Sequence, residues 1–265
     1  FNTNKGSIMA SYFIYDSINQ YRSDNTVSEG TFSGTTFTAS DSLTNHERVA
    51  DQNIGTAMSG VTANDAICYQ VGSAANADAL AMRFSGDCGI GVQNGSENTI
   101  RFGTALDGLS GAVNFGSGST VASWRIKTFT EVTNKTKFCV EFNDAQNNIS
   151  EILIGRKLDF EVEPDVNVQS SIDYENSIQR SLGGVEYALN VNEGQEIHTI
   201  SFQNISSTFK ANLITMQNFL RGESKKFVWN DGTTTHWVRL DKPMTFTEIA
   251  DGRFSTQIVL RQQIQ

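Results

Sequence analysis

Residues 151–164 read EILIGRKLDFEVEP, and this stretch decides how we divide the chain. It opens with the apolar run 152–154, which Gly155 closes. Apolar and charged residues then alternate over 158–163, and a period of two predicts a half-buried strand. Pro164 has no backbone N–H to donate, so we expect the strand to end before it.

The residues on either side of this stretch differ in character, so we predict two β-domains. The first domain would cover residues 1–160 and the second residues 161–265. The apolar side chains of the alternating part would then form the seam between the domains, and they are Leu158, Phe160 and Val162.

The composition fits a folded protein that is mainly β. Apolar residues make up 38% of the 265 residues and charged residues only 18%, and 17 Phe give enough bulk for two cores. The first half is rich in Gly, Ser, Thr and Asn, with about eight short strand-like segments separated by turn signals. This pattern predicts an antiparallel β-sandwich of the jelly-roll kind.

The second half contains longer strands and one helix. We predict the helix over 207–221, with Ser207 as its N-cap and Gly222 just beyond its end. Its apolar stripe consists of Phe209, Leu213, Met216 and Leu220. Asp231-Gly232 and Asp251-Gly252 each lie between strand-like segments and predict two hairpins.

The charge balance argues against nucleic acid and the hydropathy against a membrane. The net charge is −9 and the pI about 4.8, so a phosphate backbone would be repelled. No apolar run approaches the ~18 residues that a membrane helix needs, and no signal peptide is recognised. We therefore expect neither a nucleic-acid partner nor membrane insertion.

Cysteine usage predicts folding in a reducing cytoplasm. The chain has three cysteines, Cys68, Cys88 and Cys139, and each lies among small or apolar residues. Buried free thiols are the main interpretation, and a Cys68–Cys88 disulfide is the alternative.

No motif predicts catalysis, a metal site or a cofactor. His46 lies near Glu47 and Asp51, but no second histidine is nearby, and a surface loop explains the group better than a metal site. Neither GxSxG nor HExxH occurs, so we expect a protein that is not an enzyme.

Two resemblances bear on function. The run 124–160, WRIKTFTEVTNKTKFCVEFNDAQNNISEILIGRKLDF, resembles the end of the discoidin-like sandwich of bacteriophage virion proteins, and the match covers about residues 60–160. It implies a fold rather than sugar binding. If the sandwich does bind a sugar, the aromatic rings to stack on it would be Trp124 and Tyr69.

The second resemblance covers about residues 170–265 and is to the minor-tail and distal-tail proteins of long-tailed phages. The residues that carry it are Leu213, Phe219, Phe227, Trp229, Trp237, Phe254 and Leu260. It implies a tail-tube-like β-domain with one α-helix, which assembles into a symmetric ring with its own copies and contacts other tail proteins. Leu213, Phe219, Phe227, Trp229 and Trp237 would form the core and assembly surface of that domain.

Three functions follow as hypotheses. The first is a structural protein of the virion tail tip or baseplate, folded in the host cytoplasm. The second is a carbohydrate-binding adhesin that recognises a host surface glycan. The third is a glycan hydrolase with paired carboxylates, for which the sequence pairs no two acids.

Overall fold

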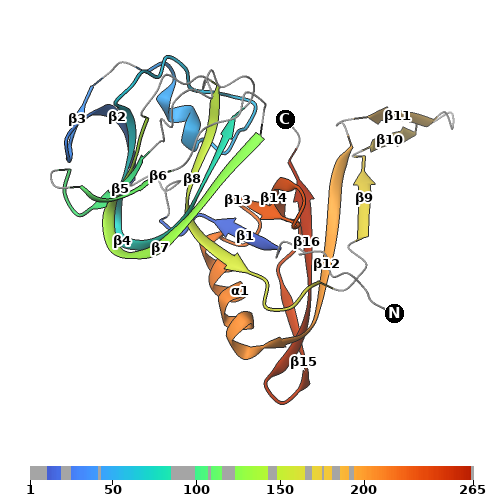
Figure 1. Ribbon diagram of the computed structural model, residues 1–265. Helices are drawn as coiled ribbons and strands as arrows, with labels where there is room; N and C mark the ends of the chain where they lie inside the picture. The colour runs from blue at the N-terminus through green and yellow to red at the C-terminus, as the bar shows by residue number, and fades with distance from the viewer. Residues whose placement is uncertain are drawn as a thin grey trace, which may run out of the picture. The chain divides into compact units, whose positions relative to one another are not determined.

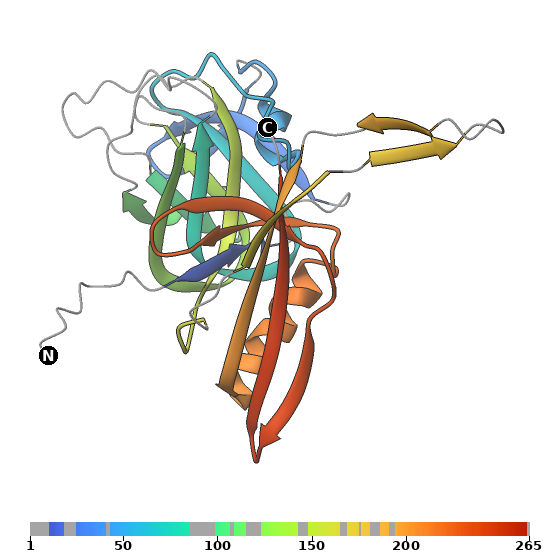
Figure 2. The same cartoon turned by 90° about the vertical axis from the view of Figure 1, so that its right-hand side faces the viewer.

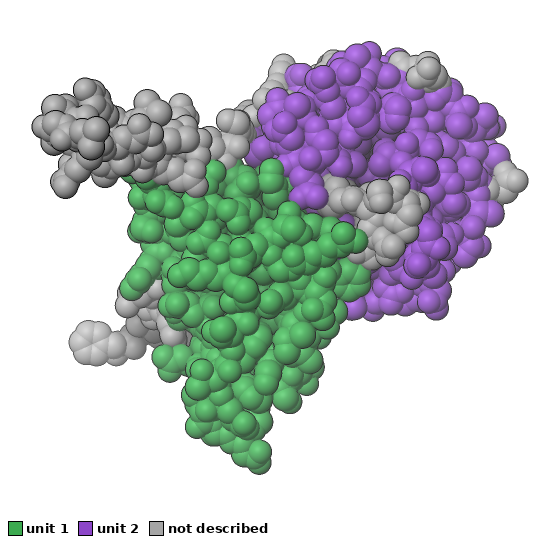
Figure 3. Space-filling model, turned by 180° about the vertical axis from the view of Figure 1, so that it is seen from behind, with its two compact units in different colours: residues 1–13, 159–264 green, residues 14–158, 265 purple. Residues whose placement is uncertain are grey.

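The computed structural model describes residues 11–18, 25–40, 43–84, 99–106, 109–114, 123–142, 148–164, 169–174, 176–180, 186–190 and 194–263. The chain is mainly β, with antiparallel strands and a single α-helix in this described part, which confirms the predicted fold class (Figure 1). The chain is divided into two compact units (Figure 3). We call residues 14–158 the sandwich unit and residues 1–13 with 159–264 the helix unit.

The sandwich unit is built on one curved antiparallel sheet. Its strand order is β6-β5-β7-β4-β8, and β2 pairs with β4 on one side and with β3 on the other. The strands are β2 (Thr26–Ser33), β3 (Thr36–Ala39), β4 (Asp65–Phe84), β5 (Thr99–Gly103), β6 (Ser110–Asn114), β7 (Ser123–Glu141) and β8 (Ile149–Asp159), and the 3-10 helix η1 spans His46–Ala50. The division between the units falls inside β8 and inside β1 (Tyr12–Tyr15).

Two long, bent strands replace several of the short strands that the sequence predicts. β4 has 20 residues and β7 has 19, and they run side by side as curved ribbons (Figures 1 and 2). The register between them shifts three times between Gln70 and Ala79, where β4 reads QVGSAANADA. Such irregularities bend a strand without ending it, and small side chains at the bend allow this.

The bend lets one sheet enclose its own core. Ile67, Tyr69 and Val71 come from the first half of β4, whereas Leu80 and Met82 come from the second half, and all belong to one buried cluster. Because the two halves of the strand face the same interior, the unit has the two packed layers of a β-sandwich.

The strands of the helix unit are also antiparallel, and α1 (Ser207–Phe219) lies alongside them (Figures 1 and 2). The strand order is β13-β14-β16-β12-β9, and β15 also pairs with β16. These strands are β9 (Gln169–Asp173), β12 (Gln195–Ser206), β13 (Lys226–Asn230), β14 (Thr235–Leu240), β15 (Thr245–Ala250) and β16 (Arg253–Gln262). β10 (Asn176–Arg180) and β11 (Glu186–Asn190) pair only with each other.

The helix and both hairpins form where the sequence predicts them. The N-cap is Ser206 rather than Ser207, because the Ser206 Oγ accepts a hydrogen bond from the Phe209 N–H at 3.1 Å. Gly222 follows the helix with φ +68°, as a residue beyond a helix end often does. The turns at 231–232 and 251–252 connect β13 to β14 and β15 to β16.

The stretch 151–164 differs from its prediction in two respects, because β8 runs through Gly155 and ends at Asp159, so residues 160–163 are not a strand. Gly155 does not close the first apolar run, because β8 continues through it to Asp159. A Cβ at Gly155 would lie 1.8 Å from the Tyr15 carbonyl oxygen, so the close approach of another backbone requires glycine here. Phe160 lies beyond the strand, and its ring packs on Phe13 at 4.7 Å and on Phe202 at 5.0 Å.

Candidate functional site

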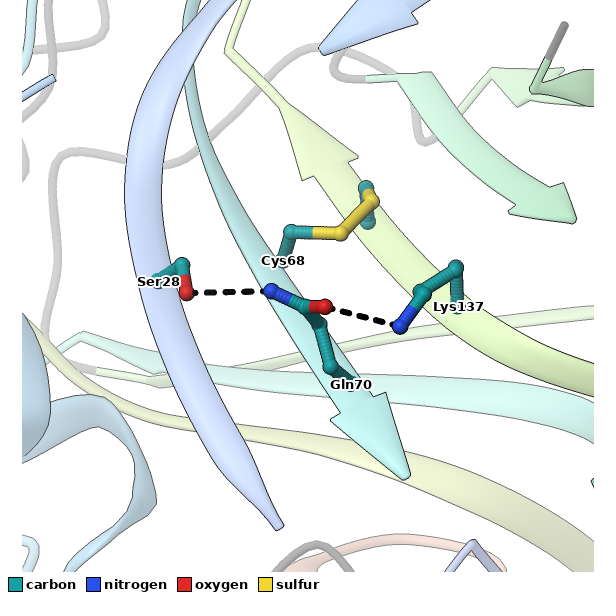
Figure 4. The surroundings of a disulfide bond; sticks show 5 residues. Ser28, Cys68, Gln70 and Lys137 are labelled. Carbon is teal, nitrogen blue, oxygen red and sulfur yellow. Dashed lines mark hydrogen bonds between the residues drawn. A yellow bond between two sulfur atoms is a disulfide. The ribbon is translucent and has the colours of Figure 1, made fainter. Parts of the chain in front are cut away.

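A disulfide joins Cys68 and Cys139 on the adjacent strands β4 and β7 (Figure 4). The two residues are direct partners in the strand register, and both side chains are buried. The predictions of free thiols and of a Cys68–Cys88 bond are therefore wrong for these residues. Spacing in the sequence could not reveal this pair, since 71 positions separate its members and only the strand register brings them together.

The disulfide marks one face of the sheet, which we call the disulfide face. Side chains alternate along a strand, so residues two apart lie on the same face. The face is therefore formed by Ser28 on β2, Cys68 and Gln70 on β4, Arg101 on β5, and Lys137, Cys139 and Glu141 on β7. It lies opposite the main core, to which Ile67 and Tyr69 belong.

One part of the disulfide face is apolar and closed. Phe32 and Phe37 of the β2–β3 hairpin and Leu109 pack with the two cysteines in a buried cluster. At this end, the Arg101 guanidinium lies 4.9 Å from the centre of the Phe32 ring and pairs with Glu141 Oε2 at 2.7 Å. The positive charge of Arg101 is therefore neutralised within the sheet.

The other part carries a chain of half-buried polar side chains (Figure 4). The Lys137 Nζ donates to Gln70 Oε1 at 2.7 Å, and the Gln70 Nε2 donates to Ser28 Oγ at 3.3 Å. Because an ammonium group only donates, the amide oxygen of Gln70 has to face Lys137. The three side chains thus hold one another in a fixed orientation across β2, β4 and β7.

The alternation of side chains along a strand predicts only part of this polar row. The run 66–71, AICYQV, places Cys68 and Gln70 on one face, which the sequence alone allows. It does not say which strand lies beside β4, so Ser28 and Lys137 are found only with the structure. No sequence pattern marks any of these three residues as functional.

The two predicted sugar-stacking aromatics differ in exposure. Tyr69 is buried in the core, and its hydroxyl donates to the Ile152 carbonyl oxygen at 3.1 Å. Burial, together with the carboxylates of Glu151 and Asp16, holds the pKa of Tyr69 well above its ordinary value. No ring face is open to a ligand, so the prediction for Tyr69 is corrected.

Trp124 is half-buried near the start of β7, opposite Arg83 on β4. It lies 137 − 124 = 13 positions from Lys137, which is roughly 40 Å along the strand. The two hydrogen bonds that form the polar row do not involve Trp124, and its stacking role stays a prediction.

The residues predicted for the core and assembly surface of the second domain lie inside the helix unit. Leu213, Phe227, Trp229 and Trp237 are buried, and Phe219 is half-buried. Buried side chains stabilise the unit itself, so an assembly surface requires other residues. The seam role of Leu158, Phe160 and Val162 stays a prediction.

Two histidines that are far apart in the sequence meet in the helix unit. The rings of His198 and His236 lie 5.1 Å apart, and both pack on Trp229. The Gln262 Oε1 lies 3.2 Å from His198 Nε2 and 3.3 Å from His236 Nδ1. The two strands that carry them, β12 and β14, flank β16, which explains why residues 38 positions apart (236 − 198) become neighbours.

Asp231 completes this group at the β13–β14 turn. Its Oδ1 accepts hydrogen bonds from the N–H groups of Thr233 and Thr234 at 2.7 and 2.6 Å, and its Oδ2 lies 3.3 Å from His236 Nε2. Burial acts to raise the pKa of Asp231, but the hydrogen bonds from Thr234, Thr233 and His236 outweigh it and lower the pKa.

The described residues contain no cluster of potential metal ligands and no membrane-spanning helix. The His46 Nδ1 lies 3.8 Å from Glu29 Oε1 and 3.9 Å from Glu47 Oε2. In the described ranges, no group of three or more potential ligands is placed to hold a metal ion. Within them, the one helix is too short to cross a membrane.

No family model and no curated protein matches the sequence. Several solved structures are similar to the chain at low identity. "CBM32 of AlyQ in complex with 4,5-unsaturated mannuronic acid" is 18% identical with a TM-score of 0.37, and the match covers 56% of this chain and 98% of that one. The family 32 CBM from C. perfringens NanJ in complex with galactose is 15% identical with a TM-score of 0.37, over 54% of this chain and 98% of the other.

A third similar structure is truncated AlyQ with its CBM32 and alginate lyase domains. It is 16% identical with a TM-score of 0.38, and the match covers 85% of this chain and 56% of that one. These structural neighbours contain carbohydrate-binding β-sandwich domains, and at such scores the likeness assigns no ligand to this chain. The resemblance to minor-tail and distal-tail proteins stays a prediction.

Proposed function

We propose that the protein binds a saccharide through the disulfide face of its sandwich unit. The observation that carries this proposal is the half-buried polar row of Ser28, Gln70 and Lys137, whose side chains orient one another. A hydroxyl, an amide and an ammonium group supply the donors and acceptors that sugar hydroxyls pair with. Because they are already ordered, a ligand would not have to immobilise them.

The disulfide supports the same proposal. Cys68 and Cys139 lie two residues from Gln70 and Lys137 along their strands, on the same face. A covalent link at this point fixes the register of β4 against β7, and with it the separation of the amide and the ammonium group. The polar row therefore rests on a rigid sheet rather than on loops.

A screen of surface glycans against the full chain tests this function, with Gln70→Ala and Trp124→Ala as variants. We expect a saccharide to bind, Gln70→Ala to weaken it at least tenfold, and Trp124→Ala to leave it unchanged. Circular dichroism should show that both variants are folded. If binding is lost with Trp124→Ala and kept with Gln70→Ala, the site lies at the start of β7 and this assignment is wrong.

The second candidate function is self-assembly through the helix unit. β9 and β15 each have one partner strand in the described part of the sheet, and they lie at opposite edges because β12 and β15 pair with different sides of β16. Ile172 near one edge and Ile249 at the other are 59% and 53% exposed. Edge strands of this kind pair with other chains, as the ring of a virion tail protein would require.

Sedimentation velocity tests this second candidate. We expect a symmetric oligomer that Ile172→Lys or Ile249→Lys converts to monomers, since a charge at either edge blocks pairing. Ile214→Lys makes the same change at an exposed position of the helix, and as the control it should leave the oligomer intact. A wild-type chain that stays monomeric at high concentration would exclude assembly through these edges.

A further inference from the structure

We propose that the saccharide bound at the disulfide face is acidic, and that Lys137 is the residue that selects its carboxylate or sulfate group. This inference rests on the proposed function and adds the chemical class of the ligand.

The Lys137 ammonium group has donors left for a ligand. Its one hydrogen bond goes to the neutral amide oxygen of Gln70 at 2.7 Å. Within the part of the chain that the structure describes, no carboxylate lies within ion-pair distance of its Nζ. An ammonium group has three donors, so two N–H groups of Lys137 remain for a ligand or water.

Lys137 differs from Arg101, the cation at the closed end of this face. Arg101 contacts Glu141 Oε2 through both Nε and Nη2 at 2.7 Å, so it is already paired. Of the two cations beside the disulfide in the strand register, Lys137 is therefore the one whose charge is left for a ligand. This local charge stands out in a chain whose net charge is −9.

The partner of Lys137, the Gln70 amide, has a fixed orientation. The Gln70 amide is held by Lys137 at its oxygen and by Ser28 at its nitrogen, so it cannot turn without losing one of the two bonds. It neutralises no charge, and the site is only half-buried. An anionic group that contacts Nζ would form a hydrogen-bonded ion pair, which adds charge–charge attraction to the hydrogen bond that a neutral hydroxyl would make there.

Matched ligands separate charge from shape. We would use isothermal titration calorimetry of the full chain with oligosaccharides of galacturonate, glucuronate and mannuronate, each beside its carboxyl-reduced neutral form. We expect one acid form to bind at least tenfold more tightly than its neutral counterpart. Raising NaCl from 50 to 300 mM should reduce this preference, because the site is partly open to solvent.

Three variants assign the preference to Lys137. Lys137→Met should abolish this preference and also weaken the neutral form, because Lys137 belongs to the polar row, whereas Lys137→Arg should keep most of the preference. Lys135→Met removes the same charge two residues away on β7 and should change nothing.

Each contrary result would overturn a specific part of the proposal. Equal binding of acid and neutral forms, lost in Gln70→Ala, would overturn the acidic ligand and leave the saccharide-binding function standing. An equal loss of preference in Lys135→Met and Lys137→Met would show a diffuse charge effect and overturn the role of Lys137. If the folded wild type binds neither these saccharides nor any glycan of the wider screen, the proposed function and this inference both fail.

Discussion

Gly155 shows at the scale of one residue how the close approach of two backbone segments restricts the sequence. A Cβ there would lie 1.8 Å from the Tyr15 carbonyl oxygen and 2.8 Å from its carbonyl carbon. Backbone atoms cannot move aside as a flexible side chain would. We expect Gly155→Ala to lower the free energy of unfolding by about 3 kcal/mol or more, measured by urea denaturation.

Gly34 provides the matched control in the same unit. Its φ is +64°, and a Cβ would meet no atom within 4 Å. Gly34→Ala should therefore cost only the strain of a left-handed backbone, about 1 kcal/mol. Equal costs for the two variants would show that the backbone at Gly155 can relax.

The polar row shows which functional residues a sequence can reveal. Alternation along β4 is enough to place Gln70 on the face opposite Tyr69. Lys137 lies 67 positions away on β7. Because strand pairing decides which side chains meet, this part of the site could not be predicted from single segments.

At the scale of elements, α1 depends on its N-cap. The Ser206 Oγ accepts from the Phe209 N–H and donates to Glu161 Oε2 at 2.6 Å, which links the helix start to the segment after β8. We expect Ser206→Ala to lower the free energy of unfolding by about 1–2 kcal/mol. Chemical denaturation followed by circular dichroism measures this loss.

Ser207 is the natural comparison for that variant. It is exposed and is the first residue of α1. Ser207→Ala should change the stability by less than about 0.5 kcal/mol. A larger loss at Ser207 than at Ser206 would restore the N-cap that the sequence pattern predicts.

The β13–β14 hairpin should respond to acid through Asp231. Its lowered pKa means that the charged carboxylate is favoured in the folded state. The stability it contributes is present above the ordinary aspartate pKa and is lost as the pH falls through the lower folded value. Asp231→Asn should therefore be less stable than wild type at pH 6, and the gap should narrow below about pH 4.

Thermal unfolding of both proteins between pH 2.5 and pH 6 measures that gap. A difference that stays constant over the whole range would mean that the charge of Asp231 does not stabilise the turn.

The elements that sequence analysis placed best are those with local signals. The helix has a 3.6-residue stripe and a capping serine, and the two hairpins have Asp-Gly turns. The bent strands have no such signal, because residues 72–78 contain only small and polar side chains that read as a loop. Pairing with β7 keeps them extended, and that is a long-range effect.

At the scale of the molecule, the disulfide predicts the thiol count. The chain has three cysteines, so the denatured but unreduced protein should show one reactive thiol and the reduced protein three. Disulfides persist in oxidising surroundings, so we expect the bond to be absent while the chain is kept in a reducing cytosol. Three reactive thiols in protein purified under air would contradict the bond.

Loss of the bond should lower the stability of the sandwich unit. The bond joins residues 71 positions apart and so lowers the conformational entropy of the unfolded chain. This stabilises the folded state by about 4 kcal/mol. In guanidinium denaturation, the double variant Cys68→Ala/Cys139→Ala should lose nearly this much free energy of unfolding. The Cys88→Ala variant should not show such a loss. Equal stability of the double variant and the wild type would mean that the bond does not constrain the unfolded chain.

The same bond also decides how the chain would carry a mechanical load. A pull on the two ends reaches Cys68 and crosses directly to Cys139, so the segment between them bears no tension while the bond is intact. That segment contains most of β4 and β7 and all of β5 and β6. In a stretching experiment, reduction should add roughly 240 Å of extensible chain, which is the length of about 70 extended residues. An attachment protein built in this way would lengthen under shear only as far as its disulfide permits.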